Sequence, residues 1–297
     1  GKSMVKAYDD RDGHIWMDGN LLPWRNANIH ILSHALHYGS SVFEGERAYN
    51  GKIFKSEQHS QRLIESGKLI DVPVPYSIDE IENAKLKILK DSKLKEAYIR
   101  VICWRASGED MGVASQRNKV RMAIAAWEWG AYYGDAKFKG ARLDISKWKR
   151  PAPDTIPWDT KASGLYMICT LSKHEAEKKG FTDSLMLDYQ GNIAEATGAN
   201  VFFKNKSGEL HTPTPDSFLN GITRRCIIDI AKSSGIKVIE RKIKPEEMSN
   251  FEGCFLTGTA AEVTPVSQID NFSFNVCEVI KQLSKSYHNL VRKKVAA

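Results

Sequence analysis

An Asn50-Gly51 pair between two strand-like runs is the local feature that most restricts how this chain can fold. Residues 41–49 and 52–55 favour strands, and Asn-Gly is a preferred centre for the two-residue type I′ turn that joins antiparallel strands. The pair therefore predicts a β-hairpin. Nearer the N-terminus, Asp18-Gly19 gives the same signal for the residues on either side of it.

Helix patterns and further strand patterns follow this hairpin. Ser56 is a candidate cap for a helix over residues 57–69, and Ser77-Ile78-Asp79-Glu80 is a capping box that opens a second helix. One further expected helix follows Lys161 and runs to about residue 179, and two others cover residues 221–234 and 275–291. Expected strands cover residues 97–104, 119–127, 141–147, 184–189, 193 onward, 199–204, 209–212, 238–241, 254–256 and 262–266.

The length of the chain and a segment typical of linkers indicate more than one domain. The 297 residues are enough for two domains, and the Gly-rich and Tyr-rich run that begins at Gly130 is typical of a link between them. We expect an α/β (α+β two-domain) fold. The N-terminal domain would cover residues 1–130, the linker 131–139 and the C-terminal domain 140–297.

Composition excludes several classes of protein. The net charge of +7 comes from 43 basic and 36 acidic residues that are spread along the chain, which disfavours a nucleic-acid partner. No apolar run reaches the roughly 18 residues of a membrane span, and we expect neither a membrane partner nor a signal peptide. The five cysteines form no C-x-x-C pair, so we expect reduced thiols in a cytoplasmic protein.

Three histidines have the spacing of metal ligands on a helix. They are His30, His34 and His37. A stoichiometric metal that chelators remove would support a metalloprotein. Spacing without a nearby carboxylate is weak evidence, so we expect no metal and a packing role for the histidines near the entrance of a site.

A lysine among small residues is the strongest chemical signal. Lys161 follows Thr160 and precedes Ala162-Ser163-Gly164, and Glu195 lies among small residues downstream. An amine can hold an aldehyde cofactor as a Schiff base and move a proton at the substrate α-carbon. A carboxylate beside a pyridine nitrogen raises the pKa of that nitrogen and keeps it protonated. The pair indicates pyridoxal 5'-phosphate chemistry.

Two small-residue turns could bind the phosphate of such a cofactor. Gly221-Ile222-Thr223 opens a helix, where backbone N–H groups and the helix dipole favour an anion. Thr257-Gly258-Thr259 is a second turn of this kind. On the expected strand over residues 97–104, Tyr98 and Arg100 project from one face, so that face either meets water or binds an anion.

Taken in order, these runs resemble the branched-chain amino acid aminotransferases, a family of fold-type IV pyridoxal phosphate enzymes, over nearly the whole chain. The residues that carry the resemblance are 33–39 (SHALHYG), 42–45 (VFEG), 61–63 (QRL), 97–100 (AYIR), 111–113 (MGV), 129–132 (WGAY), 161–162 (KA), 221–224 (GITR) and 258–262 (GTAAE). The family has a smaller N-terminal and a larger C-terminal domain, with the site between them completed by a partner. The resemblance therefore implies a homodimer or a higher homo-oligomer.

The resemblance also implies roles for single residues. Lys161 would carry the cofactor, Glu195 would pair with its ring nitrogen, and Tyr166 would hydrogen-bond its phenolic oxygen. The phosphate would be held by Arg62, Ile222, Thr223 and Thr259. The substrate α-carboxylate would meet Tyr98 and the turn at Thr259 and Ala260. The side-chain carboxylate of glutamate would meet Arg100, Tyr132 and the Tyr38 of a second subunit. The apolar wall would consist of Phe43, Tyr38, Trp129 and Val113.

The implied activity is transamination between the branched-chain L-amino acids (Leu, Ile, Val) and 2-oxoglutarate, so the partners would be amino acids and 2-oxo acids. Related fold-type IV enzymes remain alternatives, namely D-amino acid and (R)-amine transaminases and aminodeoxychorismate lyase. Arg100 favours the branched-chain type. Val101 and Ala199 depart from the family pattern, and they leave open whether amines without a carboxylate are accepted.

Overall fold

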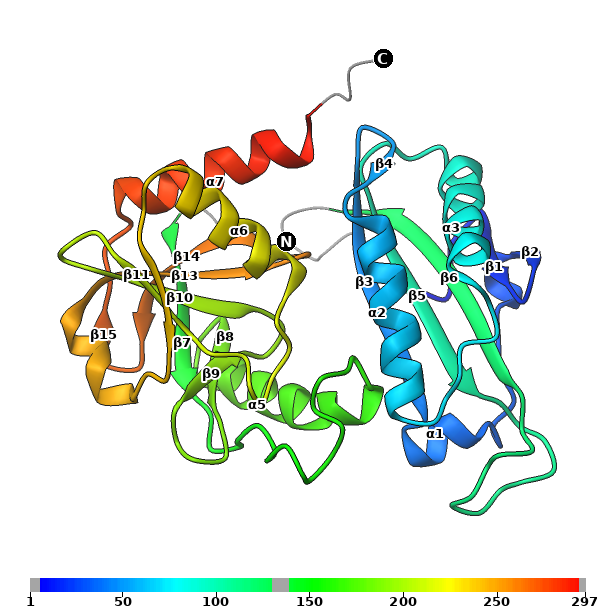
Figure 1. Ribbon diagram of the computed structural model, residues 1–297. Helices are drawn as coiled ribbons and strands as arrows, with labels where there is room; N and C mark the ends of the chain where they lie inside the picture. Colours follow the sequence, from blue (N-terminus) through cyan, green and yellow to red (C-terminus); the bar gives the residue numbers. More distant parts are fainter. Residues whose placement is uncertain (1–5, 130–138, 294–297) are drawn as a thin grey trace. The chain divides into compact units, whose positions relative to one another are not determined.

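The structure is a computed structural model that describes residues 6–129 and 139–293. The chain forms two compact units, which are labelled by element in Figure 1. The first unit comprises Gly1–Trp129 with Thr160–Gly164, and the second comprises Gly130–Asp159 with Leu165–Ala297. The expected linker, 131–139, lies outside the described residues except for Lys139. The domain bounds expected from the sequence therefore stay a prediction.

The first unit is built on an antiparallel sheet of six strands in the order β2-β1-β6-β5-β3-β4. The strands are β1 (His14–Met17), β2 (Asn20–Pro23), β3 (Ser41–Tyr49), β4 (Lys52–Ile53), β5 (Ala97–Arg105) and β6 (Val120–Glu128). Helices α2 (Ser56–Leu69) and α3 (Ile78–Ser92) pack across one face of the sheet (Figure 1). The short elements η1 (Trp24–Asn26) and α1 (His34–Tyr38) precede β3.

Strand alternation divides this sheet into two chemically different faces. Leu63 and Ile88 from the helices pack on Val42, Ile99 and Val101 of β3 and β5 in one buried cluster. Successive strand residues point to opposite faces, so the residues between these, beginning with Phe43, project from the face that the two helices leave uncovered.

The turn signals in the sequence are confirmed. Asn50 and Gly51 have φ values of 53° and 77°, and Asp18 and Gly19 have φ values of 50° and 96°, as type I′ turns require. Ser77 accepts a hydrogen bond from the Glu80 N–H, and the Glu80 side chain accepts one from the Ser77 N–H, which completes the expected capping box.

The expectation that Ser56 caps α2 is wrong. The helix already includes Ser56, and its N-cap is Lys55 in the left-handed conformation with φ of 55°. The Ser56 hydroxyl instead donates to Glu82 Oε2 on α3 at 2.7 Å. A tertiary contact has therefore displaced the local capping interaction that the sequence favoured.

The second unit contains a mixed sheet of nine strands in the order β12-β11-β10-β13-β14-β7-β8-β9, with β15 paired to β14. Strand β7 runs parallel to β14 and β8, and β11 runs parallel to β12. The strands are β7 (Ala141–Ile145), β8 (Asp183–Leu187), β9 (Ile193–Ala196), β10 (Asn200–Asn205), β11 (Leu210–Pro213), β12 (Val238–Arg241), β13 (Phe251–Gly258), β14 (Glu262–Ile269) and β15 (Phe272–Ser273).

Three labelled α-helices accompany this sheet in the part of the chain that the structure describes. They are α5 (Met167–Lys178), α6 (Ile222–Ser233) and α7 (Glu278–Val291), together with the short elements η2 (Ser163–Tyr166) and η3 (Pro245–Asn250). The helix expected after Lys161 begins at Met167, behind η2, and Lys161 lies in extended chain before both. The expected α/β fold class is confirmed by the mixture of sheets and helices.

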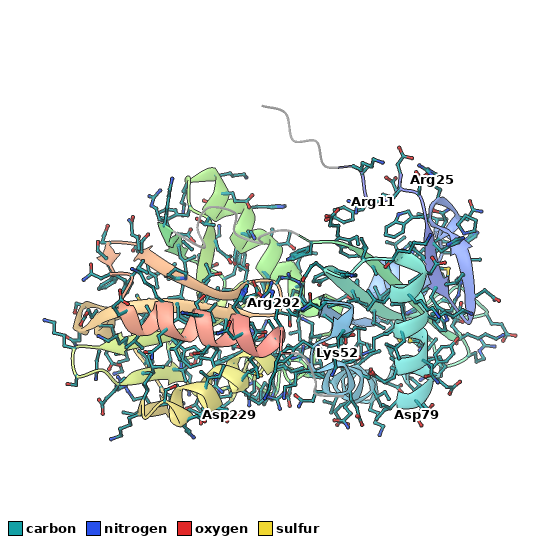
Figure 2. The ribbon with its side chains drawn as sticks, turned by 90° about the horizontal axis from the view of Figure 1, so that it is seen from above. Arg11, Arg25, Lys52, Asp79, Asp229 and Arg292 are labelled. Carbon is teal, nitrogen blue, oxygen red and sulfur yellow. The ribbon has the colours of Figure 1, made fainter. Side chains whose placement is uncertain are left out.

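Two further features are the distribution of charged side chains and the hydropathy of the helices. Figure 2 shows charged side chains on elements of both units, such as Arg25 and Asp79 in the first and Asp229 and Arg292 in the second. Over residues 6–129 and 139–293, no helix combines the length and the apolar character that crossing a membrane requires.

The capping box makes a measurable contribution to the first unit. Ser77→Ala removes the acceptor for the Glu80 N–H and should lower the free energy of unfolding by about 1 kcal/mol. Ser77→Asn keeps an acceptor and should lose only a small part of that. Urea denaturation followed by circular dichroism measures both variants. An equal loss for Ala and Asn would mean that the cap contributes nothing specific.

Candidate active site

Lys161 is held by its backbone against the rest of the first unit. Its carbonyl accepts from the Phe43 N–H at 3.1 Å, and its N–H donates to Ser66 Oγ on α2 at 3.1 Å. Ala162 forms an antiparallel bridge with Val42. The half-buried lysine therefore extends from a fixed piece of extended chain, and its Nζ lies 4.8 Å from the centre of the Phe43 ring. These contacts fix the point from which the side chain extends.

Four of the expected substrate residues gather in the first unit. Arg100 Nη2 donates to the Tyr98 hydroxyl at 2.8 Å, and its guanidinium carbon lies 4.7 Å from the centre of the Phe43 ring. The Tyr98 ring stacks on Trp129 at 4.6 Å. The arginine is half-buried beside apolar walls, and the hydroxyl and two aromatic faces stabilise its charge.

A glycine makes room for this arrangement. Gly45 lies opposite Arg100 in the register of β3 and β5, and a Cβ at Gly45 would overlap the Tyr98 hydroxyl. Any larger residue would push the tyrosine away from Arg100. The sequence analysis missed this role, although the glycine lies inside the VFEG run that it singled out.

Arg62, expected to hold phosphate, pairs with a carboxylate that the sequence analysis did not single out. Arg62 Nε and Nη2 donate to the two oxygens of Glu44 at 2.7 and 2.8 Å, and His59 Nδ1 hydrogen-bonds Glu44 Oε1 at 2.7 Å. Burial raises the pKa of the Glu44 carboxyl, but the positive charge of Arg62 and the bond from His59 outweigh it and hold the pKa well below its usual range. Glu44 therefore stays ionised and fixes the plane of the Arg62 guanidinium.

Two expected wall residues lie at a different part of the first unit. Val113 is 82% exposed and Tyr38 is 47% exposed in the single chain. The Tyr38 hydroxyl donates to the Met111 carbonyl at 3.2 Å, so the two residues belong to one local arrangement of α1 and the loop between β5 and β6. Tyr132, the remaining expected contact for glutamate, lies outside the described residues.

The second unit supplies the expected phosphate turns. Helix α6 begins at Ile222, and Thr223 and Ile222 are buried. Gly221 precedes them, and a Cβ there would overlap Asn200 Oδ1, which accepts from the Gly221 N–H at 3.1 Å. Asn200 also donates to the Leu219 carbonyl at 3.0 Å. The sequence analysis missed this role of Asn200, which fixes the start of the helix.

The second turn lies beside the first. Asn200 pairs with Thr257 in the register of β10 and β13, which brings the start of α6 next to the end of β13. A Cβ at Gly258 would lie 3.3 Å from the Gly198 carbonyl, so the chain passes closely here. Thr259 and Ala260, half-buried, continue the turn into β14. The N–H groups at a helix start and two small-residue turns fit a phosphate group.

Glu195 and Tyr166 also belong to the second unit. Glu195 is half-buried on β9, opposite Met186 of β8, and Tyr166 is the N-cap of α5. Burial raises the pKa of the Cys169 thiol on α5 to about 12, and the charge of Glu195 adds to this effect. The backbone N–H groups and hydroxyls of this unit fit a phosphate, and the Glu195 carboxylate fits a cationic ring nitrogen.

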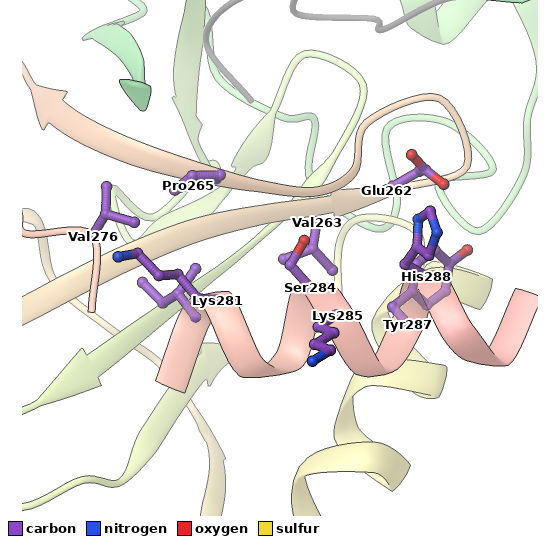
Figure 3. Close-up of a pocket in the computed structure, with 10 residues that line it drawn as sticks. Glu262, Val263, Pro265, Val276, Lys281, Ser284, Lys285, Tyr287 and His288 are labelled. Atoms are coloured by element: carbon purple, nitrogen blue, oxygen red, sulfur yellow. The ribbon is translucent and has the colours of Figure 1, made fainter. Parts of the chain in front are cut away.

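A separate cavity of about 510 Å³ lies between β14 and α7, shown in Figure 3. It is lined by Glu262, Val263, Pro265, Val276, Ile280, Lys281, Ser284, Lys285, Tyr287 and His288. None of the site residues expected from the sequence belongs to this lining, so the size of the cavity does not make it the candidate site.

The three spaced histidines use their rings for hydrogen bonds. His30 Nδ1 accepts from the Leu32 N–H, His37 Nε2 bonds the Ile31 carbonyl, and His34 is buried. Among the described residues, no cluster of His, Cys, Asp and Glu side chains is arranged to hold a metal.

Comparisons with known proteins identify the family of this chain. Residues 41–269 match the family described as "Amino-transferase class IV". The "Probable branched-chain-amino-acid aminotransferase" of Rickettsia felis is 42% identical over 94% of this chain and 96% of its own length. The crystal structure of the Escherichia coli branched-chain amino acid aminotransferase superposes with a TM-score of 0.91, at 37% identity and with 95% of each chain covered.

A further solved structure is a cofactor-bound form. It is the branched-chain amino acid aminotransferase from Thermobaculum terrenum in its PLP form, with a TM-score of 0.87, 28% identity and 95% of each chain covered. The fold and the donor set define a fold-type IV enzyme that uses pyridoxal phosphate. The chain belongs to the class IV aminotransferase family, and the family expected from the sequence is confirmed.

Gly45 offers a sharp test of the site geometry. Gly45→Ala should displace Tyr98 and lower the free energy of unfolding by about 1–3 kcal/mol, the usual cost of overpacking. Gly112→Ala is the matched control, because a Cβ there would meet nothing within 4 Å. Near-ultraviolet circular dichroism reports the Tyr98 and Trp129 stack, and urea denaturation reports stability. Unchanged spectra and stability for Gly45→Ala would contradict the assigned role.

Proposed function

We propose that this chain catalyses transamination between branched-chain L-amino acids (Leu, Ile, Val) and 2-oxoglutarate, with pyridoxal 5'-phosphate as cofactor. The observation that carries the proposal is the place of Arg100 on the sheet face that α2 and α3 leave uncovered. There it is hydrogen-bonded to Tyr98 and flanked by Phe43. A guanidinium that neighbouring aromatic groups stabilise can receive a carboxylate, and the apolar walls can receive an aliphatic side chain. The relatives that the chain matches carry the corresponding names.

The cofactor, when bound, supplies a ring that accepts the electron pair left by the substrate α-proton. We assign its phosphate to the N–H groups of Ile222 and Thr223 and to Thr259 and Arg62. Glu195 holds a proton on the ring nitrogen, because a carboxylate raises the pKa of a neighbouring nitrogen base. Tyr166 donates to the phenolic oxygen.

Lys161 has two tasks in this proposal. Its amine would carry the cofactor in the resting enzyme. The same amine would then move the proton between the substrate α-carbon and the cofactor's C4′ carbon. The backbone contacts at Phe43 and Ser66 fix the point from which the Lys161 side chain extends. The hydroxyl of Tyr98, with Thr259 and Ala260, receives the α-carboxylate.

We further propose that the protein is a cytoplasmic homodimer, or a higher homo-oligomer, whose partner supplies Tyr38 and Val113. Support comes from an apolar patch on α1, the preceding turn and the adjoining loop, where Ile31, Leu36 and Val113 are 68%, 58% and 82% exposed. A second copy of this chain is the partner that symmetric assembly favours. The five cysteines are free thiols, as expected in a reducing compartment.

Absorbance spectroscopy tests the cofactor and the substrate together. The purified protein, incubated with pyridoxal phosphate, should show a near-violet band that shifts when L-leucine is added. D-alanine and a simple chiral amine should leave the band in place. A band that shifts with D-alanine but not with L-leucine would replace the branched-chain proposal by the D-amino acid alternative.

Lys161→Ala should reduce transamination at least about a thousandfold, because the proton carrier is lost. Circular dichroism should show an unchanged fold, since the side chain is half-buried and the backbone holds its position. The measurement is the rate of amino transfer from leucine to 2-oxoglutarate. Lys139→Ala is a control lysine substitution. Wild-type turnover in Lys161→Ala would remove the proposed mechanism.

Arg100→Met should raise KM for glutamate and 2-oxoglutarate by about tenfold to a hundredfold, the range for losing a hydrogen bond to a charged group. The KM for leucine should change little, because methionine preserves the apolar volume. Steady-state kinetics with each amino donor makes the comparison. An equal loss for leucine and glutamate would mean that Arg100 only supports the structure.

A further inference from the structure

The three histidines singled out by their spacing differ in how far their contacts reach. His30 and His37 bond backbone groups two and six residues away, at Leu32 and Ile31, so they fasten the chain around α1 to itself. His34, between them, reaches residues 78 and 79 positions away, at Gly112 and Val113. Of the three rings, His34 is therefore the one that connects its segment to the loop between β5 and β6.

His34 is a buried hydrogen-bonding bridge. The side chain is 2% exposed, its Nδ1 lies 2.8 Å from Ser40 Oγ, and its Nε2 lies 2.9 Å from the Gly112 carbonyl and 3.2 Å from the Val113 carbonyl. Carbonyl oxygens only accept, so Nε2 carries a proton and donates it toward these two carbonyls. The ring also stacks on Tyr38, with centroids 4.5 Å apart.

The loop between β5 and β6 is held differently at its base and at its tip. Asn118 donates to the Ala106 carbonyl at 2.9 Å and to the Asp110 carbonyl at 2.8 Å, and Arg117 pairs with Asp110. These contacts lie within the loop and close its base. At the tip, residues 111–113, the contacts go to α1: Tyr38 bonds the Met111 carbonyl, and His34 bonds the next two carbonyls.

We propose that His34 is a positioning residue that fixes the loop tip, and through it the Val113 side chain, as one wall of the apolar substrate pocket. The inference rests on the proposed function, in which Val113 contacts the aliphatic side chain of the substrate. A valine that is 82% exposed in the single chain has little packing of its own to fix it. The two hydrogen bonds from His34 to the backbone at residues 112 and 113 define its position instead.

A pair of substitutions separates the two sides of the ring. In His34→Gln, the longer amide can place a donor where Nε2 lies and keep the bond to the Gly112 carbonyl. In His34→Asn, the shorter amide can reach Ser40 but not the loop. His37→Ala is the control, because His37 lies on the same helix and bonds the neighbouring Ile31 carbonyl rather than the loop.

The first readout is amide hydrogen exchange of residues 110–114, which does not depend on activity. We expect exchange to become about tenfold faster in His34→Asn, as for the loss of one buried hydrogen bond, and to stay near wild type in His34→Gln and His37→Ala. Unchanged exchange in His34→Asn would overturn the role of His34 in holding the tip.

The second readout is steady-state kinetics of enzyme that shows the full near-violet cofactor band. We expect His34→Asn to raise KM for leucine about tenfold with little change in kcat, and His34→Gln to restore the wild-type KM. Faster exchange with an unchanged KM for leucine would overturn the link between the tip and the substrate pocket. A wild-type enzyme without transaminase activity would defeat the proposed function, while the exchange result would still report on the tip.

Val113→Ala keeps the inference testable if His34→Asn does not fold. The side chain is exposed, so its truncation should leave the fold intact while raising KM for leucine more than KM for alanine. Equal KM values for wild type and Val113→Ala with every amino donor would show that Val113 is not a pocket wall, and the proposal would fail.

Discussion

Two buried carboxylates on β3 are the constraint on which the first unit depends. Glu44 and Glu46 are fully buried beneath α2 and α3, and an unpaired charge there would be prohibitively costly. Arg62 and His59 of α2 satisfy Glu44, and Lys85 of α3 bonds Glu46 at 2.8 Å. Each helix therefore contributes a cation at a fixed point of the strand. Removing one partner of such a pair typically costs about 3–5 kcal/mol, so the pairs lock the helices in register.

The two carboxylates respond to burial in opposite ways. Burial raises the pKa of Glu46 to about 8, although Lys85 opposes the shift. Glu44, two residues away, has its pKa held low because two donors, Arg62 and His59, converge on it. The bidentate contact also fixes the orientation of Arg62, the residue proposed to hold phosphate. The same interaction that attaches α2 to the sheet thus prepares a cofactor-binding side chain.

Sequence patterns predicted turns and helix caps correctly where these depend only on neighbouring residues. The Asn50-Gly51 turn and the Ser77 capping box depend on a few adjacent residues, and both were predicted correctly. Ser56 was misassigned because its hydroxyl bonds Glu82 on another helix, a contact that no local pattern encodes. The extended chain at Lys161 is also fixed by distant residues, because Phe43 and Ser66, about a hundred residues earlier, hydrogen-bond its backbone.

The residue roles depended on the family resemblance, and the supporting residues around them could not be read from spacing. Gly45 and Asn200 act through close approach: one leaves room for the Tyr98 hydroxyl, and the other fixes Gly221 at the start of α6. Their importance follows from the register of paired strands, which the sequence does not display. His34 was noticed for a metal-like spacing, yet its partners are carbonyls of a distant loop.

The alternation of β3 explains how one strand can serve both stability and specificity. Glu44 and Glu46 face the helices, while Phe43 and Gly45 lie on the same face as the proposed substrate residues of β5. A shift of one residue in register would bury Phe43 under the helices and expose the carboxylates. The ion pair of Glu44 with Arg62 and the hydrogen bond from Lys85 to Glu46 oppose that shift, because it would leave buried polar groups without partners. These buried contacts therefore keep Phe43 and Gly45 on the same face of the sheet as Tyr98 and Arg100, and the apolar wall and the carboxylate receptor that we propose depend on that arrangement.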